Sequence, residues 1–127
     1  MKRKVAVLGV GQTQHGARRG DVSIPGLVRE AVDRALADAG LEHRDIDAVV
    51  IGKAPDMLEG IAMPEQFLVG AVGGHMKRVI RVHTAGSVGA STAITAMTHV
   101  ASGLYGRVLC IAFEKQSEGN AMWALSP

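Results

Sequence analysis

The segment of this sequence best suited to chemistry is Val82–Ser91, which reads Val-His-Thr-Ala-Gly-Ser-Val-Gly-Ala-Ser. A β-rich run ends at Val82 and a helix of small residues is predicted to begin at Ser87, so His83 occupies a sharp turn between them. A residue at such a turn faces the positive end of the helix dipole, where a developing anion is stabilised. Gly86 lets a ligand approach the turn closely. The alternative is a loop histidine, with its hydrogen bonds satisfied, before a helix that only packs.

The other residue types that bind metals or act as nucleophiles are scattered along the chain. The five histidines are His15, His43, His75, His83 and His99. No pair of them has the spacing of a zinc site, so we expect no metal. The single cysteine, Cys110, falls in a predicted buried strand, where a thiol behaves as a small hydrophobic group and its thiolate is disfavoured. We expect Cys110 to belong to the core.

A glycine pair near the N-terminus resembles part of a dinucleotide-binding turn. Gly9 and Gly11 follow a predicted strand, as that motif requires. The motif also needs a third glycine where Gln14 stands, and a helix that starts at once. A polar loop continues to Val22 instead, so we expect an ordinary turn from a strand into a loop.

Composition limits the class of protein. The chain has 127 residues, 47% of them hydrophobic and 20% charged, which is typical of one globular domain. Its net charge of +2 is too balanced to indicate a nucleic-acid partner. No apolar stretch approaches the roughly 18 residues of a membrane span, and the run Val5–Val10 is too short for a signal peptide. A single cysteine fits a reducing compartment, so we expect a soluble cytoplasmic protein.

Strand and helix patterns alternate along the chain. The predicted strands are Lys4–Gly9, Asp47–Gly52, Lys77–Val82 and Arg107–Phe113. Between them we predict a helix from Ser23 to Gly40, a loop with a short helix over Pro64–Val72, and a long helix over Ser87–Ser102. This order predicts an α/β fold with a mostly parallel sheet and right-handed crossover connections.

The first and last predicted helices carry end signals. Ser23 can cap the first helix and Pro25 is tolerated in its first turn, while Gly40 supplies the stop. Gly103 ends the long helix in the same way. No such signal ends the chain, and the apolar residues Ala121–Leu125 would be left uncovered. We therefore expect the natural protein to continue beyond the last residue given.

Several of these segments together resemble the thiolase superfamily. Its sterol-carrier-protein type has Cys-Ala-(Ser/Thr)-Gly-Ser at the turn and Phe-Glu-Lys-x-Ser after the fourth strand, which this chain matches around His83 and at Phe113–Ser117. The segments Val5–Thr13 and Ala35–Val50 are similar to the first βαβ unit of that family. The resemblance covers essentially all 127 residues. It is especially close to actinobacterial lipid-transfer proteins of the acetyl-CoA acetyltransferase type, found among steroid-degradation genes.

The resemblance implies a fold and an assembly. Residues 1–127 would form the N-terminal half of a thiolase, with strand order 3-2-1-4 and helices on both faces, and the C-terminal half would be absent. Family members dimerise through this half, partly by pairing their third strands and with help from the segment Pro55–Gly74. The helix Ser87–Ser102 would be the most buried element of the whole protein. Without the other half, one of its faces would be exposed.

The resemblance also implies an activity, with one departure. The family acts on acyl-CoA thioesters as substrates and needs no other cofactor, so we expect an acyltransferase of lipid or steroid metabolism. His83 stands where the nucleophilic cysteine normally lies, with Gly86 and Ser87 as substrate-binding residues beside it. A histidine cannot carry the usual acyl-thioester intermediate, but it can act as a general base or an oxyanion donor. Two alternatives remain: a thiolase-fold aldolase that acts on β-hydroxyacyl-CoA with a small partner protein, and a non-catalytic acyl-CoA or lipid carrier.

Overall fold

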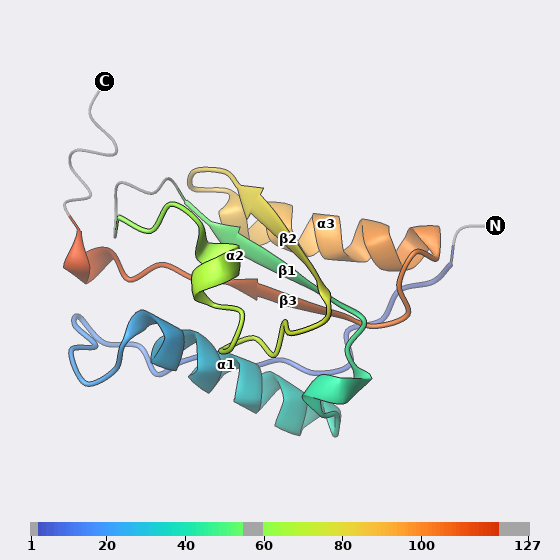
Figure 1. The fold of residues 1–127 in the computed structure, drawn as a ribbon, viewed down its shortest axis with the longest axis horizontal. Coiled ribbons are helices and arrows are strands. Elements are labelled where there is room, and N and C mark those ends of the chain that lie inside the picture. Colours follow the sequence, from blue (N-terminus) through green and yellow to red (C-terminus); the bar gives the residue numbers. More distant parts are fainter. Residues whose placement is uncertain (1–2, 55–59, 120–127) are drawn as a thin grey trace.

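The computed structural model describes residues 3–54 and 60–119, so the apolar segment Ala121–Leu125 lies outside the described residues. The elements, drawn in Figure 1, are α1 (Ile24–Ala39), η1 (His43–Asp45), β1 (Ala48–Lys53), α2 (Pro64–Phe67), β2 (Arg78–His83), α3 (Val88–Ser102), β3 (Val108–Ala112) and η3 (Gln116–Glu118). The three strands form a parallel sheet in the order β2-β1-β3. The predicted α/β class with a parallel sheet is therefore confirmed.

The central strand β1 forms the centre of the core. All six of its residues are buried, and the β-branched Val49, Val50 and Ile51 suit a strand that is covered on both faces. Its register pairs Val49 with Val79 of β2 and with Leu109 of β3. Each fully buried valine or isoleucine contributes on the order of 1.5–3 kcal/mol by leaving water.

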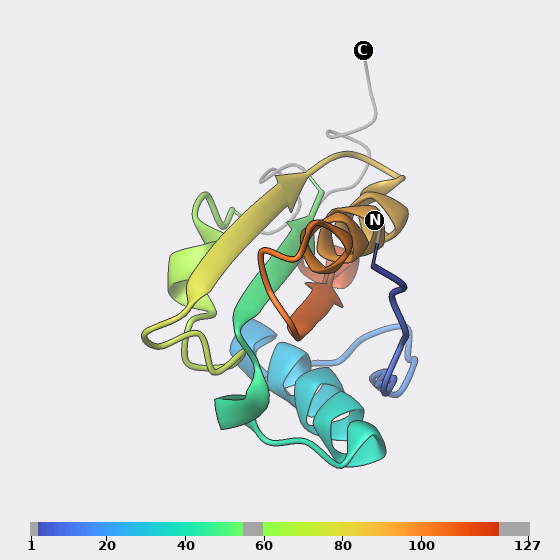
Figure 2. The same cartoon turned by 90° about the vertical axis from the view of Figure 1, so that its right-hand side faces the viewer.

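Helices cover the two faces of the sheet (Figure 2). Successive strand residues point to opposite faces. On one face, Val49 and Ile51 join the core cluster that contains Val28 and Val32 of α1. On the other face, Gly52 lies against Thr92 of α3. The expectation of helices on both faces is thus met.

Helix α1 begins and ends where its sequence signals predicted. The Ser23 hydroxyl oxygen accepts a hydrogen bond from the backbone N–H of Gly26, at 3.2 Å. Gly40 adopts a left-handed conformation with φ of 64° and closes the helix. Its buried side chains lie three to four residues apart and face the sheet; they are Leu27, Val28, Ala31, Val32 and Leu36.

Helix α3 exposes one face, as the resemblance implied for a chain without the other half. Only Thr92 and Ala96 are buried among its residues, whereas Ile94 and Met97 are 63% and 54% exposed. The prediction that one face of this helix is exposed in the present chain is confirmed. Among the described elements of this chain β1 is the most buried, and the burial of α3 in the whole protein stays a prediction.

The predicted first strand, Lys4–Gly9, is wrong. This segment is neither helix nor strand; it runs along α1, where a Cβ on Gly9 or on Gly11 would lie within 2.6 Å of the helix backbone. The Val10 N–H donates to Asp38 of α1, at 2.9 Å. Because β1 and β3 hydrogen-bond directly to each other, the sheet has no place for another strand between them. The predicted order 3-2-1-4 is therefore corrected: the sheet of the described residues has three strands, and they are the predicted third, second and fourth strands in that order.

The short helix α2 also differs from its prediction. It ends at Phe67, and turns replace the expected helical residues up to Val72. Leu68 and Val72 are nevertheless buried in the core cluster, which explains the apolar pattern that predicted a longer helix. Gly73 follows with φ of 62°, a conformation that a helix cannot contain.

Candidate functional site

Polar side chains gather where the three strands end. Lys53 is the last residue of β1, His83 is the last residue of β2, and Glu114 lies two residues beyond β3. Because the strands are parallel, these residues share one edge of the sheet, which we call the carboxyl edge. Ligands of open α/β sheets bind outside this edge. The carboxyl edge is therefore the candidate site.

His83 belongs to β2 and not to the turn that follows. It is exposed, and its Cα is in register with Lys53 of β1. Alternation along β2 places His83 on the same face as Arg81, whose guanidinium lies 3.5 Å from Glu65 of α2. Helix α3 covers the opposite face. The strand therefore continues one residue further than predicted, and it turns His83 away from the dipole of α3.

Gly86 and Ser87 lie in the exposed turn between β2 and α3. A Cβ on Gly86 would meet no atom within 4 Å, so the turn is open. Ser87 is the N-cap of α3, but its side chain makes no capping hydrogen bond within the described residues. The neighbouring Thr84 has a buried hydroxyl oxygen that also lacks a hydrogen-bond partner there. The turn thus offers unused polar groups beside His83.

A close contact fixes the start of α3 against the sheet. A Cβ on Gly52 would lie 1.9 Å from the Thr92 hydroxyl oxygen, so only glycine fits at this position. Thr92 is fully buried and donates to the carbonyl oxygen of Val88, at 2.6 Å. Since Gly52 directly precedes Lys53, this contact sets the position of the helix relative to the carboxyl edge.

Lys53 and Glu114 are site residues that the sequence analysis did not single out. Lys53 is completely buried, and its Nζ lies 3.7 Å from Glu114 Oε2. Glu114 Oε1 also accepts a hydrogen bond from the backbone N–H of Ala54. One signal was available in the sequence: each is a charged residue directly after an apolar β-rich run, and parallel strands bring such positions together.

Two depressions flank β3. A cleft of about 630 Å³ lies between the loop Gly11–Ala17, the first turns of α1 and the segment Cys110–Ser117, which includes Glu114. A more apolar groove of about 390 Å³ lies between the segment Val5–Gly11, α1, α3 and β3. The first volume is within the range of small-molecule sites. It reaches the carboxyl edge through Glu114.

Cys110 is exposed on β3, contrary to the prediction that it belongs to the core. It points to the face of α3, where the small residues of that helix leave the apolar groove open. Partial desolvation still raises the pKa of its thiol above the ordinary value. The thiolate is therefore disfavoured at neutral pH.

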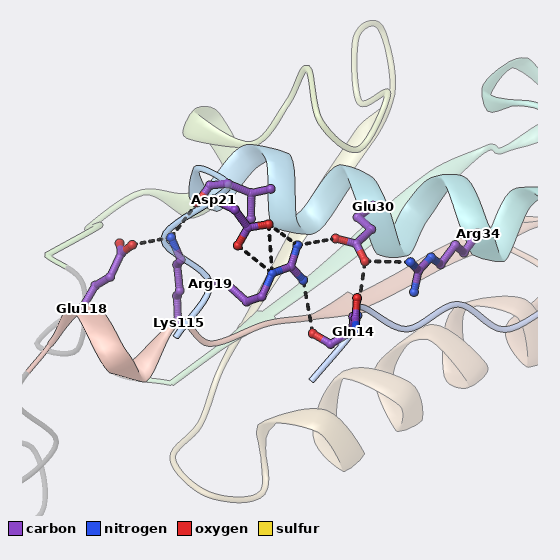
Figure 3. A network of polar contacts seen from close by, with 8 residues as sticks. Gln14, Arg19, Asp21, Glu30, Arg34, Lys115 and Glu118 are labelled. Carbon is purple, nitrogen blue, oxygen red and sulfur yellow. Dashed lines mark hydrogen bonds and ion pairs between the residues drawn. The ribbon is translucent and has the colours of Figure 1, made fainter. Parts of the chain in front are cut away.

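A network of charged side chains holds the loop before α1 (Figure 3). Arg19 donates to Asp21 and to Glu30 of α1, each at 2.9 Å, and also to the carbonyl oxygen of Gln14. These hydrogen bonds from Arg19 lower the pKa values of Asp21 and Glu30 below their ordinary range. Lys115 donates to the carbonyl oxygen of Val22, at 2.7 Å. The loop is thereby tied both to α1 and to the segment after β3.

The part of the chain that the structure describes contains neither a metal-binding group of side chains nor a membrane-spanning helix. No group of three or more His, Cys, Asp or Glu side chains there is arranged to hold a metal ion. None of its helices combines the length and the apolar character that crossing a membrane requires.

Comparison with known proteins identifies relatives by sequence. No family model matches the chain. It is 31% identical over 120 residues to an acetyl-CoA acetyltransferase of Methanothermobacter thermautotrophicus, an alignment that covers 91% of this chain and 30% of the relative. It is 26% identical over 121 residues to sterol carrier protein 2 of Gallus gallus, covering 94% of this chain and 22% of that protein. The chain thus spans less than a third of the length of these curated relatives.

Solved structures share the fold. The 3-oxoacyl-[acyl-carrier-protein] synthase III of Aquifex aeolicus superposes with a TM-score of 0.67 at 21% identity, over 80% of this chain and 33% of that one. The priming β-ketosynthase of the R1128 polyketide pathway gives a TM-score of 0.70 at 20% identity, over 96% of this chain and 46% of that one. Sequence relatives and fold relatives agree, and they support distant homology of this chain to the thiolase superfamily over part of its relatives' length.

Proposed function

We propose that this chain is the N-terminal part of a thiolase-like acyl-CoA C-acyltransferase, of the acetyl-CoA acetyltransferase type, that acts in lipid or steroid metabolism in the cytoplasm. The observation that carries the proposal is the place of His83 at the carboxyl edge, before the open turn that contains Gly86 and Ser87. The 31% sequence identity of this chain to an acetyl-CoA acetyltransferase supports the same conclusion. A C-terminal half would supply the rest of the site.

The chemistry assigned to His83 differs from that of a cysteine. As a neutral imidazole, His83 would remove a proton from the α-carbon of an acetyl-CoA thioester. The resulting carbanion attacks the carbonyl carbon of a second acyl-CoA, and the carbon–sulfur bond of that thioester breaks. The products are a 3-ketoacyl-CoA and a CoA thiolate, which takes the proton from His83. Gly86 leaves room for the thioester, and the Ser87 hydroxyl is available to donate to its oxygen.

A second candidate is a carbon–carbon lyase that cleaves β-hydroxyacyl-CoA side chains with a small partner protein. The histidine at the position of the nucleophilic cysteine favours this candidate, because a retro-aldol cleavage needs a base and no acyl-enzyme thioester. Should neither reaction occur, the same fold would serve as an acyl-CoA or lipid carrier.

Self-association is part of the proposal. Strand β2 lies at an edge of the described sheet, so its outer hydrogen-bonding groups are available to the β2 of a second copy. Apolar side chains surround this edge: Met63 and Phe67 are 53% and 54% exposed, and Met76, just before β2, is fully exposed. A homodimer through this edge would cover them.

The proposal is tested with the complete gene product. It is incubated with acetoacetyl-CoA plus free CoA, and separately with a β-hydroxy steroid-side-chain CoA, with and without the small partner protein. Acetyl-CoA release from the first substrate supports the acyltransferase, and cleavage of the second substrate alone supports the lyase. His83→Ala should abolish turnover, whereas His75→Ala, an exposed histidine before β2, should not. Unchanged turnover in His83→Ala would exclude a catalytic role for this residue.

A further inference from the structure

The carboxyl edge contains a buried charge that the proposed reaction does not yet use. Lysine is almost never fully buried unless it is paired, yet Lys53 has no exposed surface. Its Nζ lies 3.7 Å from Glu114 Oε2 and donates to the carbonyl oxygen of Ala54, at 3.4 Å. Glu114 Oε1 accepts a hydrogen bond from the N–H of the same Ala54. Glu114 therefore holds both the ammonium of Lys53 and the backbone just beyond β1.

Stability alone does not explain a charge at this position. Burying an ammonium and a carboxylate carries a desolvation cost, and apolar side chains of similar volume are often equally or more stabilising. Val49 and Ile51, which lie on the same face of β1 as Lys53, are apolar and fully buried. A methionine at position 53 would continue that face. A role in positioning the neighbouring residues explains the pair better.

The sheet order places this pair beside His83. Strand β1 lies between the other two, so Lys53 has His83 in register on the β2 side and Glu114 on the β3 side. Neighbouring strands lie about 4.8 Å apart. The ammonium stem is flexible, but its contact with Glu114 draws it towards β3. Glu114 thus helps to fix the position of the charge on Lys53, whose backbone is in register with His83.

We propose that Lys53 and Glu114 are a positioning pair for His83: Glu114 fixes the end of β1 and holds the Lys53 ammonium at a set place on the strand next to His83. The inference rests on the proposed role of His83 in acyl-CoA chemistry. A fixed, buried charge acts more strongly than one in solvent on negative charge that develops at a thioester oxygen. Because Lys53 is buried, it acts through the position of its neighbours and does not itself touch substrate.

The test compares Lys53→Met, Lys53→Arg, Glu114→Gln and the double variant Lys53→Met/Glu114→Gln in the complete gene product. Arg34→Gln is the matched control, because Arg34 also pairs with a glutamate, Glu30, but on α1. The first readout is the NMR signal of the His83 ring, assigned by its loss in His83→Ala. The second is kcat and KM on the substrate that the protein turns over. Thermal unfolding reports how much of each variant is folded.

Lys53→Met and Glu114→Gln should each shift the His83 signal and lower kcat by about tenfold to a hundredfold, with KM changed by about twofold or less. Lys53→Arg keeps the charge and should recover most of the kcat. The double variant should be no worse than either single one, because the two residues act as a unit. Arg34→Gln should leave the signal and kcat unchanged.

The proposal fails if the His83 signal in Lys53→Met and Glu114→Gln matches that of the unaltered protein. It also fails if kcat falls only in proportion to the loss of folded protein, or if Lys53→Arg is as impaired as Lys53→Met. The NMR readout needs no turnover. A complete protein without activity on either substrate would therefore refute the proposed function while still deciding the role of this pair.

Discussion

Helices α1 and α3 have nearly the same length, 16 and 15 residues, but are built in opposite ways. Helix α1 has a side-chain cap at Ser23 and buries five apolar side chains against the sheet. Helix α3 has no side-chain cap bond at Ser87 within the described residues, and it buries only Thr92 and Ala96. Both end in a left-handed glycine. The difference lies in how each helix begins and in what it covers.

This contrast separates the helix that stabilises the fold from the helix that lies beside the candidate site. The contacts of α1 are made within the chain, so they stabilise the fold directly. The apolar side chains of α3 that remain exposed, Ile94 and Met97, contribute little until something covers them. The start of α3, which has no side-chain cap bond within the described residues, also lies next to the carboxyl edge, where a cap would occupy polar groups that the proposed substrate needs. Stability is concentrated in α1 and the sheet, whereas the proposed chemistry is placed at the turn before α3.

Gly52→Ala should produce the largest effect, because it breaks the contact that ties α3 to the sheet. The added methyl group would overlap the Thr92 hydroxyl, which lies 1.9 Å from its ideal position. We expect a loss of about 3 kcal/mol in the free energy of unfolding, measured by urea denaturation. Adding Thr92→Ala should recover part of this loss. If Gly52→Ala is as stable as the unaltered chain, the contact does not fix α3.

Truncating one side chain in each helix measures how much each helix contributes to the stability of the chain. Val32→Ala removes a completely buried side chain of α1 and should cost about 2 kcal/mol. Ile94→Ala on α3 should change the stability of the same chain by less than about 0.5 kcal/mol. Thermal unfolding of the two variants checks the contrast. Equal losses would show that α3 is as well covered as α1.

The helix starts can be compared by removing one hydroxyl from each. Ser23→Ala deletes the capping bond to Gly26 and should destabilise the chain by about 1 kcal/mol. Ser87→Ala deletes no capping bond, so the free energy of unfolding should stay within about 0.5 kcal/mol of its original value. Chemical denaturation resolves a difference of this size. A loss in Ser87→Ala as large as that in Ser23→Ala would contradict the absence of a side-chain cap at the start of α3.

The smallest expected effect is on the pH dependence of thermal stability, through the ion pair that holds the loop before α1. The pKa of Glu30 is below its ordinary value because Arg19 donates to the carboxylate. A carboxyl group with a lowered pKa stabilises the folded state above its unfolded pKa of about 4.3, and this contribution disappears as pH falls towards the folded value. Glu30→Gln should therefore flatten the decline of thermal stability below about pH 4.3. Since the pair is only partly buried, the change should be small and should shrink further in high salt.

Much of the fold could be predicted because local signals and tertiary contacts agree. Ser23 and Gly40 bound α1 as their residue types indicate, and the β-branched run around Val50 forms the central strand. The same reasoning failed for Lys4–Gly9, whose pattern is that of a strand. The direct pairing of β1 with β3 leaves no position between them for this segment. Strand propensity describes one segment at a time, so it cannot reveal which segments pair in the sheet.

The site was predicted in part for a similar reason. His83, Gly86 and Ser87 stand in one motif, so the sequence alone brings them together. Lys53 and Glu114 are 61 positions apart by their residue numbers, and only the parallel pairing of β1 with β3 makes them neighbours. The face on which His83 lies depends on whether β2 ends before or after it. If β2 ended at Val82, the turn and not the alternation of the strand would set the direction of the His83 side chain.

The pairing of β1 with β3 also has a consequence for synthesis on the ribosome. Ala48 finds its partner Val108 only after 60 more residues have been made. Until then, the fully apolar centre of β1 has an unpaired side and no complete core to enter. Sheets built from such distant pairings fold slowly and expose aggregation-prone strands meanwhile. The nascent chain is therefore expected to need a chaperone, or slow expression at low temperature, until β3 has emerged.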